Sequence, residues 1–370
     1  MKKNPDIKRP TLLLNTERAL KNIAWMAEKA SNDNVRFRPH FKTHQSALIG
    51  KWFKKYGVEA ITVSSVEMAD YFAENGWKDI TIAFPVNIRE IDKINQLTTK
   101  ICLNLLVESL ETVGFLEKNV KSKTDVWIKV DVGYRRTGVM WDQHKKLKEL
   151  AEAIKKSKKL SLTGLLTHAG HTYHAGSPDE IRQIFNETRQ RMQATADLLS
   201  RFSHDNVQIS IGDTPGCTLA TNFQGVDEVR PGNFVFYDVM QMNLGVCREE
   251  QIAVGVACPV VAIHPERGEI VIHGGAVHFS KEFIIDEKGK NVFGYIAELS
   301  DSGWSPIVKN TFLSSLSQEH GIIKTDASFI ARVKVSDVLV VLPIHSCLTV
   351  NLMRKYLTTD GKEIKTMFCE

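Results

Sequence analysis

The sequence predicts an α/β protein, in which a (β/α)8 barrel (a TIM barrel) is followed by a second, mostly β domain at the C-terminal end. Over the first two-thirds of the 370 residues, eight short apolar runs alternate with longer amphipathic stretches, as in such a barrel. A doubly wound open sheet would carry a Gly-rich turn after its first strand, and the sequence has none there. After about residue 245 the helical periodicity fades and β-type runs follow. We therefore expect the barrel over 10–245 and the β domain over 246–370.

The predicted barrel strands are the short apolar runs. In chain order they are Val35–Pro39, Ala60–Ser65, Asp79–Pro85, Ile101–Glu108, Asp125–Gly133, Leu162–Gly170, Val207–Asp213 and Glu228–Asp238. Between them, apolar residues recur at intervals of three and four, which predicts amphipathic helices. Examples are Val66–Asn75, Gln143–Ser157 and Asp179–Ser203.

The predicted strands of the second domain are separated by turns that contain Gly, Asp or Pro. They are Ala253–Ile263, Glu269–His273, Asn291–Glu298, Phe329–Val335, Val338–Leu342 and Leu348–Met353. The first strand-like run of the chain, Thr11–Leu14, fits either domain, so residues 1–14 could pack with the β domain.

The composition is that of an ordinary soluble globular protein. Apolar residues make up 43% and charged residues 25%, which is typical of globular proteins. No segment approaches the roughly 20 apolar residues of a membrane helix, and no apolar signal-peptide run follows the basic Met1–Pro10 segment. We expect a cytoplasmic protein that does not bind a membrane.

Two further features bear on partners and redox state. The net charge of +5 is spread over helical stretches such as Lys145–Lys159 and is not interleaved with aromatic residues, so we expect no nucleic-acid binding. The six cysteines show no CxxC spacing, so reduced thiols are expected.

A lysine stands at the end of the first predicted barrel strand, in Arg38-Pro39-His40-Phe41-Lys42-Thr43-His44. Barrel active sites lie at the C-terminal ends of the strands. A partly desolvated lysine there can bind pyridoxal 5'-phosphate (PLP) as a Schiff base. A lysine taken alone is more often a surface residue, but two histidines and an arginine beside Lys42 favour the functional interpretation.

Two segments at the other side of the predicted barrel suit a phosphate group. Strand seven ends in Gly212-Asp213-Thr214-Pro215-Gly216, and Arg230-Pro231-Gly232-Asn233 lies at the start of strand eight. Small residues let backbone N–H groups approach phosphate oxygens, and the Thr214 hydroxyl adds a donor. The alternative is that both segments are simple turns.

Two more clusters carry chemistry. Arg136, in the Asp131–Gly138 segment after strand five, could hold an anion such as the PLP phenolate, or form a surface ion pair. His345 and Cys347 lie two residues apart on a predicted strand, so both side chains would share one side and could bind zinc. The alternative is a buried structural cysteine beside a histidine. A catalytic zinc would take further ligands, such as His320 or a substrate oxygen.

Together these segments resemble the D-threonine aldolase / D-serine dehydratase family of fold-type III PLP enzymes, which have an alanine racemase-like barrel. The resemblance runs from about Pro10 to Asn351. It implies PLP, a divalent metal for which zinc is favoured, a small-molecule D-amino acid substrate, and a homodimer with active sites at the subunit interface.

The resemblance also implies roles for individual residues. Lys42 would hold PLP, Arg136 would contact its phenolic oxygen, and Arg230 would face the pyridine nitrogen. The phosphate would lie between Gly212–Pro215 and Glu228–Gly232, with Thr214, Gly232 and Asn233 as candidate contacts. His345 and Cys347 would bind the metal, and His168 and Tyr173 belong to a similar active-site segment, His168-Ala169-Gly170-His171-Thr172-Tyr173.

The sequence departs from the family pattern at three places. Gln45 stands where a lysine is usual, His273-Gly274-Gly275 replaces an Asp-Ala-Gly turn, and Gln318-Glu319-His320 replaces a segment with two acids. The last two lie in the predicted β domain, where the substrate is discriminated, so the cofactor is predicted more firmly than the substrate.

We therefore predict a PLP- and metal-dependent lyase acting on a β-hydroxy D-amino acid, with Lys42, His345 and Cys347 as catalytic residues. In the family, His-x-Cys resembles the dehydratases and His-x-Asp the aldolases, so β-elimination as in D-serine dehydratase is favoured. Retro-aldol cleavage to glycine and an aldehyde stays open. So do an amino-acid racemase, although no second-domain segment resembles the racemase tyrosine, and a non-catalytic PLP carrier.

Overall fold

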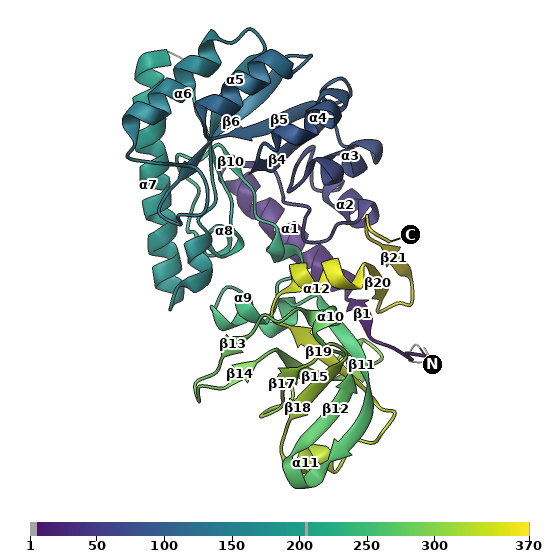
Figure 1. Cartoon of the computed structure of the whole chain (residues 1–370). Coiled ribbons are helices and arrows are strands. Elements are labelled where there is room, and N and C mark those ends of the chain that lie inside the picture. Colours follow the sequence, from purple (N-terminus) through teal and green to yellow (C-terminus); the bar gives the residue numbers. More distant parts are fainter. Residues whose placement is uncertain (1–5, 204–205, 370) are drawn as a thin grey trace. The chain divides into compact units, whose positions relative to one another are not determined.

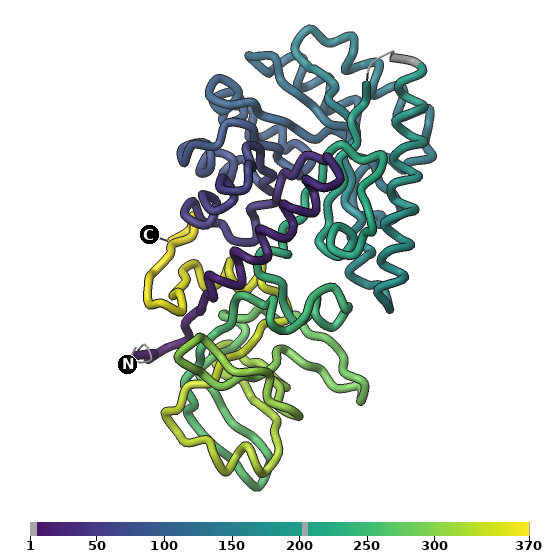
Figure 2. Tube along the Cα trace, turned by 180° about the vertical axis from the view of Figure 1, so that it is seen from behind, coloured from purple at the N-terminus to yellow at the C-terminus, as the bar shows by residue number. Residues whose placement is uncertain are grey.

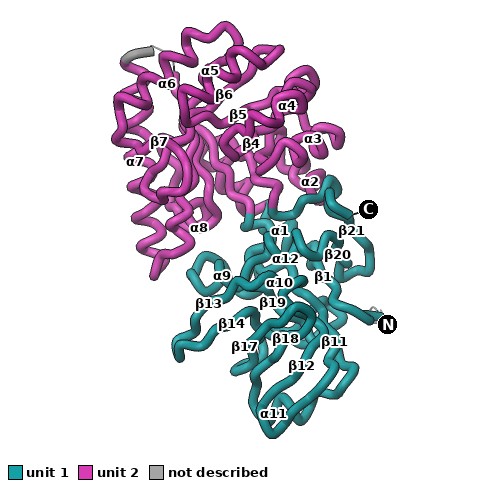
Figure 3. The backbone as a smooth tube through the Cα atoms, viewed as in Figure 1, with its two compact units in different colours: residues 1–23, 43–48, 233–370 teal, residues 24–42, 49–232 magenta. Residues whose placement is uncertain are grey.

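The structure, a computed structural model, describes residues 6–203 and 206–369 (Figure 1). It comprises two compact units (Figure 3). One consists of residues 1–23, 43–48 and 233–370, and the other of residues 24–42 and 49–232. The predicted boundary after residue 245 lies inside the first of these units.

The second unit is a nearly closed parallel barrel, as the sequence predicts. Its strands follow the order β2-β10-β9-β8-β6-β5-β4-β3. They are β2 (Arg36–Phe37), β3 (Ala60–Val63), β4 (Asp79–Pro85), β5 (Cys102–Val107), β6 (Thr124–Asp131), β8 (Leu160–Thr167), β9 (Gln208–Ile211) and β10 (Glu228–Val229), with β7 (Val139–Met140) paired to β6. A parallel bridge between His40 and Thr62 joins the two ends of this order. All eight predicted strands overlap a barrel strand, so the fold class is confirmed.

The helix α1 (Thr16–Asn32) precedes the first barrel strand, and the helices after it follow barrel strands and cover their outer faces (Figure 1). In chain order they are α2 (Ala47–Lys54), α3 (Val66–Glu74), α4 (Ile91–Thr98), α5 (Leu110–Asn119), α6 (His144–Lys156), α7 (Pro178–Ser203) and α8 (Thr214–Leu219). Local capping sets several starts: the Ser65 hydroxyl accepts from the Met68 N–H at 3.1 Å, and the Ser109 hydroxyl accepts from the Thr112 N–H at 3.1 Å.

The last barrel strand is shorter than predicted. Glu228–Asp238 is not one strand, because β10 ends at Val229 and a 3-10 turn, Asn233–Val235, follows. Pro231 lacks an N–H for the ladder, which is why pairing stops there. Arg230 and Gly232 therefore lie beyond the strand rather than within it.

The first unit contains a mostly antiparallel sheet with the order β12-β18-β17-β15-β19-β11-β1-β20-β21. Its strands are β1 (Thr11–Leu14), β11 (Val254–His264), β12 (Glu269–His273), β15 (Gly294–Ser300), β17 (Phe312–Leu316), β18 (His320–Lys324), β19 (Val338–Pro343), β20 (Lys355–Thr358) and β21 (Glu363–Lys365), with β16 (Gly303–Trp304) paired to β15. A small hairpin, β13 (Ile284–Ile285) and β14 (Asn291–Val292), lies apart from it. β1 pairs with β11 and β20, among the strands of the C-terminal half (Figure 2).

Two predicted strands of this unit are short helices, so both predictions are wrong. Phe329–Val335 overlaps α11 (Ala327–Ile330), whose start is capped by Asp326, accepting from the Phe329 N–H at 3.0 Å. Leu348–Met353 lies in α12 (Ser346–Met353). A short apolar run is compatible with a buried strand or a buried helix, and its periodicity alone does not separate them. The other helices of the unit are α9 (Val239–Asn243) and α10 (Ala276–Phe279).

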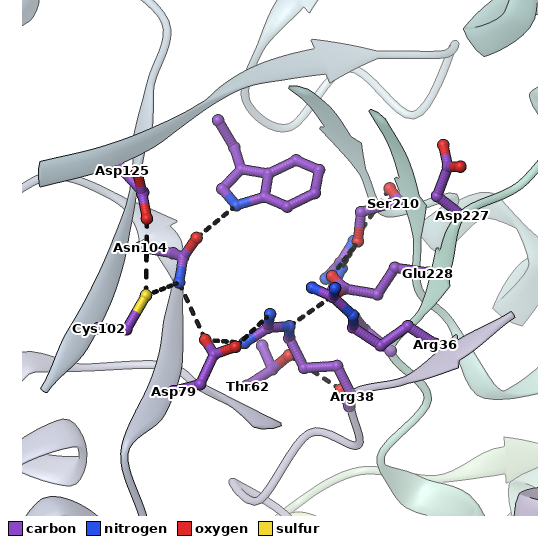
Figure 4. Close-up of polar contacts among 12 residues, drawn as sticks. Arg36, Arg38, Thr62, Asp79, Cys102, Asn104, Asp125, Ser210, Asp227 and Glu228 are labelled. Carbon is purple, nitrogen blue, oxygen red and sulfur yellow. Dashed lines mark hydrogen bonds and ion pairs between the residues drawn. The ribbon is translucent and has the colours of Figure 1, made fainter. Parts of the chain in front are cut away.

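A buried polar network ties the barrel strands together from the inside (Figure 4). The Arg38 guanidinium donates to Glu228 at 2.5 Å and to both oxygens of Asp79 at 2.6 and 3.1 Å. The Arg38 and Glu228 side chains are each 1% exposed. Burial by itself lowers the pKa of Arg38, but the two carboxylates outweigh it and raise that pKa. Arg38 therefore holds β2, β4 and β10 in register and does not serve the cofactor.

We expect Glu228→Gln to destabilise the barrel by about 3 kcal/mol, because it leaves part of the buried Arg38 charge uncompensated. The measurement is the urea midpoint of the barrel unit followed by tryptophan fluorescence. Arg36→Gln is the matched control: Arg36 is half-exposed and lies 3.9 Å from the same carboxylate, so its loss should cost less than about 1 kcal/mol. Equal midpoints for the two variants would contradict the assignment.

Candidate functional site

Lys42 is held at the mouth of the barrel by the residues around it. The Phe41 N–H donates to Thr62 O on β3 at 2.8 Å, and the His40 N–H donates to Pro231 O at 2.9 Å. The Phe41 ring is fully buried and packs against Phe53 at a centroid distance of 5.0 Å. Its neighbour Lys42 is exposed. The apolar anchor thus fixes the backbone and leaves the Lys42 amine at the C-terminal ends of the strands, where barrel active sites lie.

His168 brings three of the predicted residues into one electrostatic environment. It follows β8, and its Nδ1 contacts the Gly212 carbonyl after β9. Burial, together with the positive charges of Arg136 and Lys42, lowers the pKa of His168 well below its ordinary value. His168 is therefore a neutral imidazole beside two cations.

Aromatic rings accompany these cations. The Tyr134 ring lies 6.2 Å from His168 and the Arg136 guanidinium lies 5.2 Å from the centre of the Tyr134 ring. Tyr173 is 6.2 Å from His168 on its other side. A flat, anionic molecule would find both ring faces and positive charge here.

Lys129 is a functional candidate that the sequence reasoning missed. It lies on β6, is buried, and donates to the Val130 carbonyl at 3.1 Å. Burial, followed by the charge of Arg230, lowers the pKa of Lys129 to about 7. The sequence does place this lysine between two apolar residues, Ile128 and Val130, of a predicted barrel strand, and a buried lysine is energetically costly.

Arg230 lies inside the barrel. Its Nε donates to Ser210 Oγ at 2.7 Å and its Nη2 donates to Thr167 O at 2.5 Å. Burial lowers the pKa of Arg230 to about 10, so the guanidinium stays charged. Gly212 permits this position, because a Cβ there would lie 2.9 Å from the Arg230 Cβ. A cation fixed in this way suits a ring nitrogen or another acceptor facing the barrel.

The segment after β9 brings Thr214 and Tyr173 together. The Tyr173 hydroxyl accepts from the Thr214 N–H at 3.4 Å. Asp213 caps α8 by accepting from the Gly216 N–H at 2.6 Å, and burial raises the pKa of Asp213 to about 6. The Gly216 N–H is already hydrogen-bonded to Asp213. An anion at the start of α8 would therefore contact Thr214.

The His345–Cys347 pair is brought together by a helix start and not by a strand, which corrects the prediction. His345 is the N-cap residue of α12, with φ −132°, and Cys347 lies in the first turn. The His345 imidazole hydrogen-bonds to Cys347 on one side and its Nδ1 bonds Glu282 at 2.8 Å on the other. Burial lowers the pKa of His345, but these two partners outweigh it and raise that pKa to about 11. The surroundings of the pair therefore favour a positive charge at this position.

Asp238 anchors the start of α12. Its carboxylate is fully buried and accepts from the Ser346 N–H at 3.0 Å and from the Asn233 amide at 2.6 Å. The same Asn233 amide lies 3.8 Å from Cys347 Sγ. The structure thus places the Asn233 side chain with the His345–Cys347 pair, within the first unit.

The segment that follows Lys42 also reaches α12. Thr43 is fully buried, and its hydroxyl lies 3.3 Å from Cys347 Sγ. Gln45, where the family pattern has a lysine, donates to the Asn351 amide oxygen at 3.2 Å. His44 accepts from the Ser46 N–H at 3.1 Å, and burial lowers the pKa of His44 to about 3. His44 is therefore a neutral structural residue and not an acid or base.

Within residues 6–203 and 206–369, no third His, Cys, Asp or Glu joins the His345–Cys347 pair with all its ligand atoms within 4.8 Å. The structure therefore does not bring His320 to the pair. The six cysteines are all free thiols.

Two family sequence models match the chain. The model described as "Alanine racemase, N-terminal domain" matches residues 14–239, which is more than half of the chain. The model described as "Putative serine dehydratase domain" matches residues 253–359. In the part of the chain that the structure describes, no helix is long and apolar enough to span a membrane.

The chain is similar to dehydratases over nearly its whole length. It is 28% identical to the D-threo-3-hydroxyaspartate dehydratase of Delftia sp. (strain HT23), over 95% of this chain and 94% of the relative. It is also 28% identical to the D-serine dehydratase of Dictyostelium discoideum, over 90% of this chain and 89% of the relative. The solved Delftia structure aligns with a TM-score of 0.92 at 26% identity over 99% of each chain. A cysteine-to-alanine variant of that dehydratase, described as a metal-free form, has the same TM-score at 25% identity over 99% of each chain.

Proposed function

The chain belongs to the alanine racemase N-terminal domain family, and from this premise we propose that it is a PLP- and metal-dependent lyase. Its reaction is β-elimination of the hydroxyl group from a β-hydroxy D-amino acid. The observation that carries the proposal is the His345–Cys347 pair, with Thr43 at 3.3 Å from the thiol. Thr43 is the residue directly after Lys42.

The barrel residues fit an anionic, planar cofactor such as PLP. Lys42, Arg136 and Arg230 supply positive charge, while His168 stays neutral. In this proposal Lys42 binds the cofactor, Arg136 faces its phenolic oxygen, and Thr214 with Gly232 and the Asn233 backbone face its phosphate. When bound, PLP supplies an electron sink for charge that develops at Cα.

Lys42 is also the proposed base for the Cα proton of the substrate. In this proposal the Lys42 amine would remove the Cα proton of the substrate, because it is the nucleophile at the mouth of the barrel and is exposed there. Lys129, with its pKa of about 7, is partly neutral at physiological pH and keeps the barrel interior from accumulating further positive charge.

The His345–Cys347 pair fits a soft divalent ion. Imidazole nitrogen with thiolate sulfur favours zinc over magnesium or manganese. A bound ion supplies Lewis acidity to the departing β-hydroxyl. Because imidazole and thiol must both be deprotonated to bind an ion, metal affinity should increase with pH.

The test is a substrate screen of the purified protein with PLP and zinc. D-Serine, D-threonine and D-3-hydroxyaspartate are assayed beside their L-forms, and keto acid, glycine and racemised product are scored separately. Keto acid from a D-isomer alone, abolished by a chelator and restored by zinc, is the expected result. Glycine would assign the aldolase reaction, racemised product a racemase, and no turnover with bound PLP a carrier; each would overturn β-elimination.

Glu282 is expected to orient His345 for the metal. Its carboxylate fixes Nδ1 as the hydrogen-bearing nitrogen, so the other ring nitrogen faces Cys347. Glu282→Ala should weaken zinc binding about 10- to 100-fold, measured by competition with a chromophoric chelator, and raise the zinc concentration needed for half-maximal turnover. Glu287→Ala, an exposed acid in the same segment, is the control. Unchanged zinc affinity in the Glu282 variant would contradict the role.

We also propose that the enzyme is a cytoplasmic homodimer. Six free cysteines suit a reducing compartment. The dimer is measured by light scattering of the PLP-loaded protein, and a monomer of 41.7 kDa that turns over substrate would contradict it.

A further inference from the structure

We propose that His273, His278 and Glu319 form a second divalent-metal site in the β-sheet unit, for a first-row transition ion such as Zn²⁺. One ligand atom from each of the three side chains lies within 4.8 Å of the other two. The His273 Nε2 and Glu319 Oε2 atoms are 3.7 Å apart. Two imidazoles and a carboxylate are a recurrent zinc donor set that leaves a position for water or a ligand.

The backbone brings these side chains together from two different turns. His273 ends β12, and Glu319 lies in the turn between β17 and β18. The Gly274 N–H donates to Glu319 O at 2.9 Å, and the Ala276 N–H donates to Ser317 O at 2.8 Å. The two turns are therefore hydrogen-bonded to each other, so the positions of the donor side chains are set by the sheet.

Glycine makes this close approach possible. A Cβ on Gly275 would lie 2.3 Å from Gln318 O, and one on Gly321 would lie 2.5 Å from Gly274 O. Residues with side chains would force the turns apart and separate His273 from Glu319. His273-Gly274-Gly275 and Gln318-Glu319-His320, two of the three places where the sequence departs from the family pattern, thus contribute to one cluster.

His278 completes the set from α10. Its ring lies edge-on to the His273 ring at a centroid distance of 5.9 Å. Its Nδ1 accepts from the Gly275 N–H at 3.1 Å, which fixes the ring beside the turn. Coordination through either ring nitrogen exchanges the Gly275 hydrogen bond for a metal bond, which is a small cost.

The geometry needs small side-chain rotations. Two ligands on a tetrahedral zinc with bonds of about 2.0–2.1 Å are about 3.3 Å apart, close to the His273–Glu319 separation. The side chains of His273 and Glu319 are 41% and 49% exposed, so an ion can enter from solvent and keep a bound water. The simpler alternative is a surface ion pair between His273 and Glu319 that binds no metal.

The test is zinc stoichiometry of the full-length protein after chelator treatment, measured by equilibrium dialysis. Cys347→Ala removes the other proposed ion, so the variant should retain one zinc per chain. In the Cys347→Ala background, a further His278→Ala substitution should abolish binding of this zinc. A further Glu319→Gln substitution should weaken zinc binding at least about ten-fold. Adding His264→Ala, on β11 of the same sheet and 3.7 Å from Glu266, should leave one zinc bound.

Cobalt separates the two sites spectroscopically. Co²⁺ bound by Cys347 gives an intense thiolate band in the near ultraviolet, whereas Co²⁺ at His273, His278 and Glu319 gives weak visible bands alone. The weak visible bands should persist in Cys347→Ala. No zinc in Cys347→Ala, or one zinc retained in both the His278 and Glu319 double variants with unchanged unfolding temperature, would overturn the proposal. One zinc in both the wild type and Cys347→Ala would uphold it and would instead contradict metal binding at His345–Cys347.

Discussion

Lys42→Ala is expected to reduce turnover of the preferred D-amino acid by at least about 10³-fold, because in the proposed function one amine both binds the cofactor and removes the Cα proton. General acid–base catalysis alone contributes about 10²- to 10⁴-fold, and loss of the covalent attachment adds to it. The measurement is keto-acid formation under saturating PLP, together with the visible absorbance of the bound cofactor. That absorbance should change in position, since free PLP carries no lysine.

The control variants for Lys42 distinguish the loss of its positive charge from the loss of its nucleophilic amine. Lys42→Arg retains the positive charge but not the nucleophile, so it should be as inactive as the alanine variant. Lys51→Ala, at an exposed lysine of α2, should leave turnover unchanged. A small primary amine added to Lys42→Ala should restore part of the activity, because it replaces the missing base. Wild-type turnover in Lys42→Ala would remove the basis of the proposed function.

Cys347→Ala and His345→Ala are expected to reduce β-elimination by about 10³-fold while the cofactor absorbance stays in place. In the proposed function these residues hold an ion that would stabilise the departing hydroxyl by several kcal/mol, and about 4 kcal/mol corresponds to that factor. The two effects should not add, because either substitution removes the same ion. Keto-acid formation is measured across a zinc titration, and neither variant should reach the wild-type rate at any zinc concentration.

A matched cysteine makes the thiol experiment specific. Cys102→Ala removes an exposed thiol of the barrel and should retain full activity and zinc dependence. Unfolding temperatures are compared because Thr43 and Asn233 also contact Cys347, and a packing defect would lower that temperature. Full activity of Cys347→Ala in the presence of a chelator would contradict a metal role for the pair.

The fold was largely predictable because its signals are local. Each barrel strand and helix carries its own periodicity within one short stretch of chain, so eight strands could be counted without knowing their partners. The predictions failed where a short apolar run is compatible with both a buried strand and a buried helix. Leu348–Met353 is an apolar run of strand length, and its helical state follows from Asp238, more than a hundred residues away, which anchors the Ser346 N–H.

Candidate residues were predictable where chemistry is visible in a residue type at a strand end, as for Lys42, Arg136 and the His345–Cys347 spacing. Their supporting partners were not, because each comes from a distant segment. Glu282 meets His345 across 63 positions of the chain, and Thr43 meets Cys347 across 304. Arg38 shows the opposite case: it stands in the lysine motif, yet its guanidinium belongs to the barrel interior.

By itself, the sequence determined the barrel, the mostly β second domain, and the residue types that suit PLP and a metal, since periodicity and side-chain chemistry are local properties. The tertiary structure decided that His345 and Cys347 meet at a helix start, that Lys129 and Arg230 are buried, and that His273, His278 and Glu319 form one cluster. These outcomes depend on which distant segments pack together. A donor's direction and the pKa of a buried group are set by such neighbours, which no local pattern records.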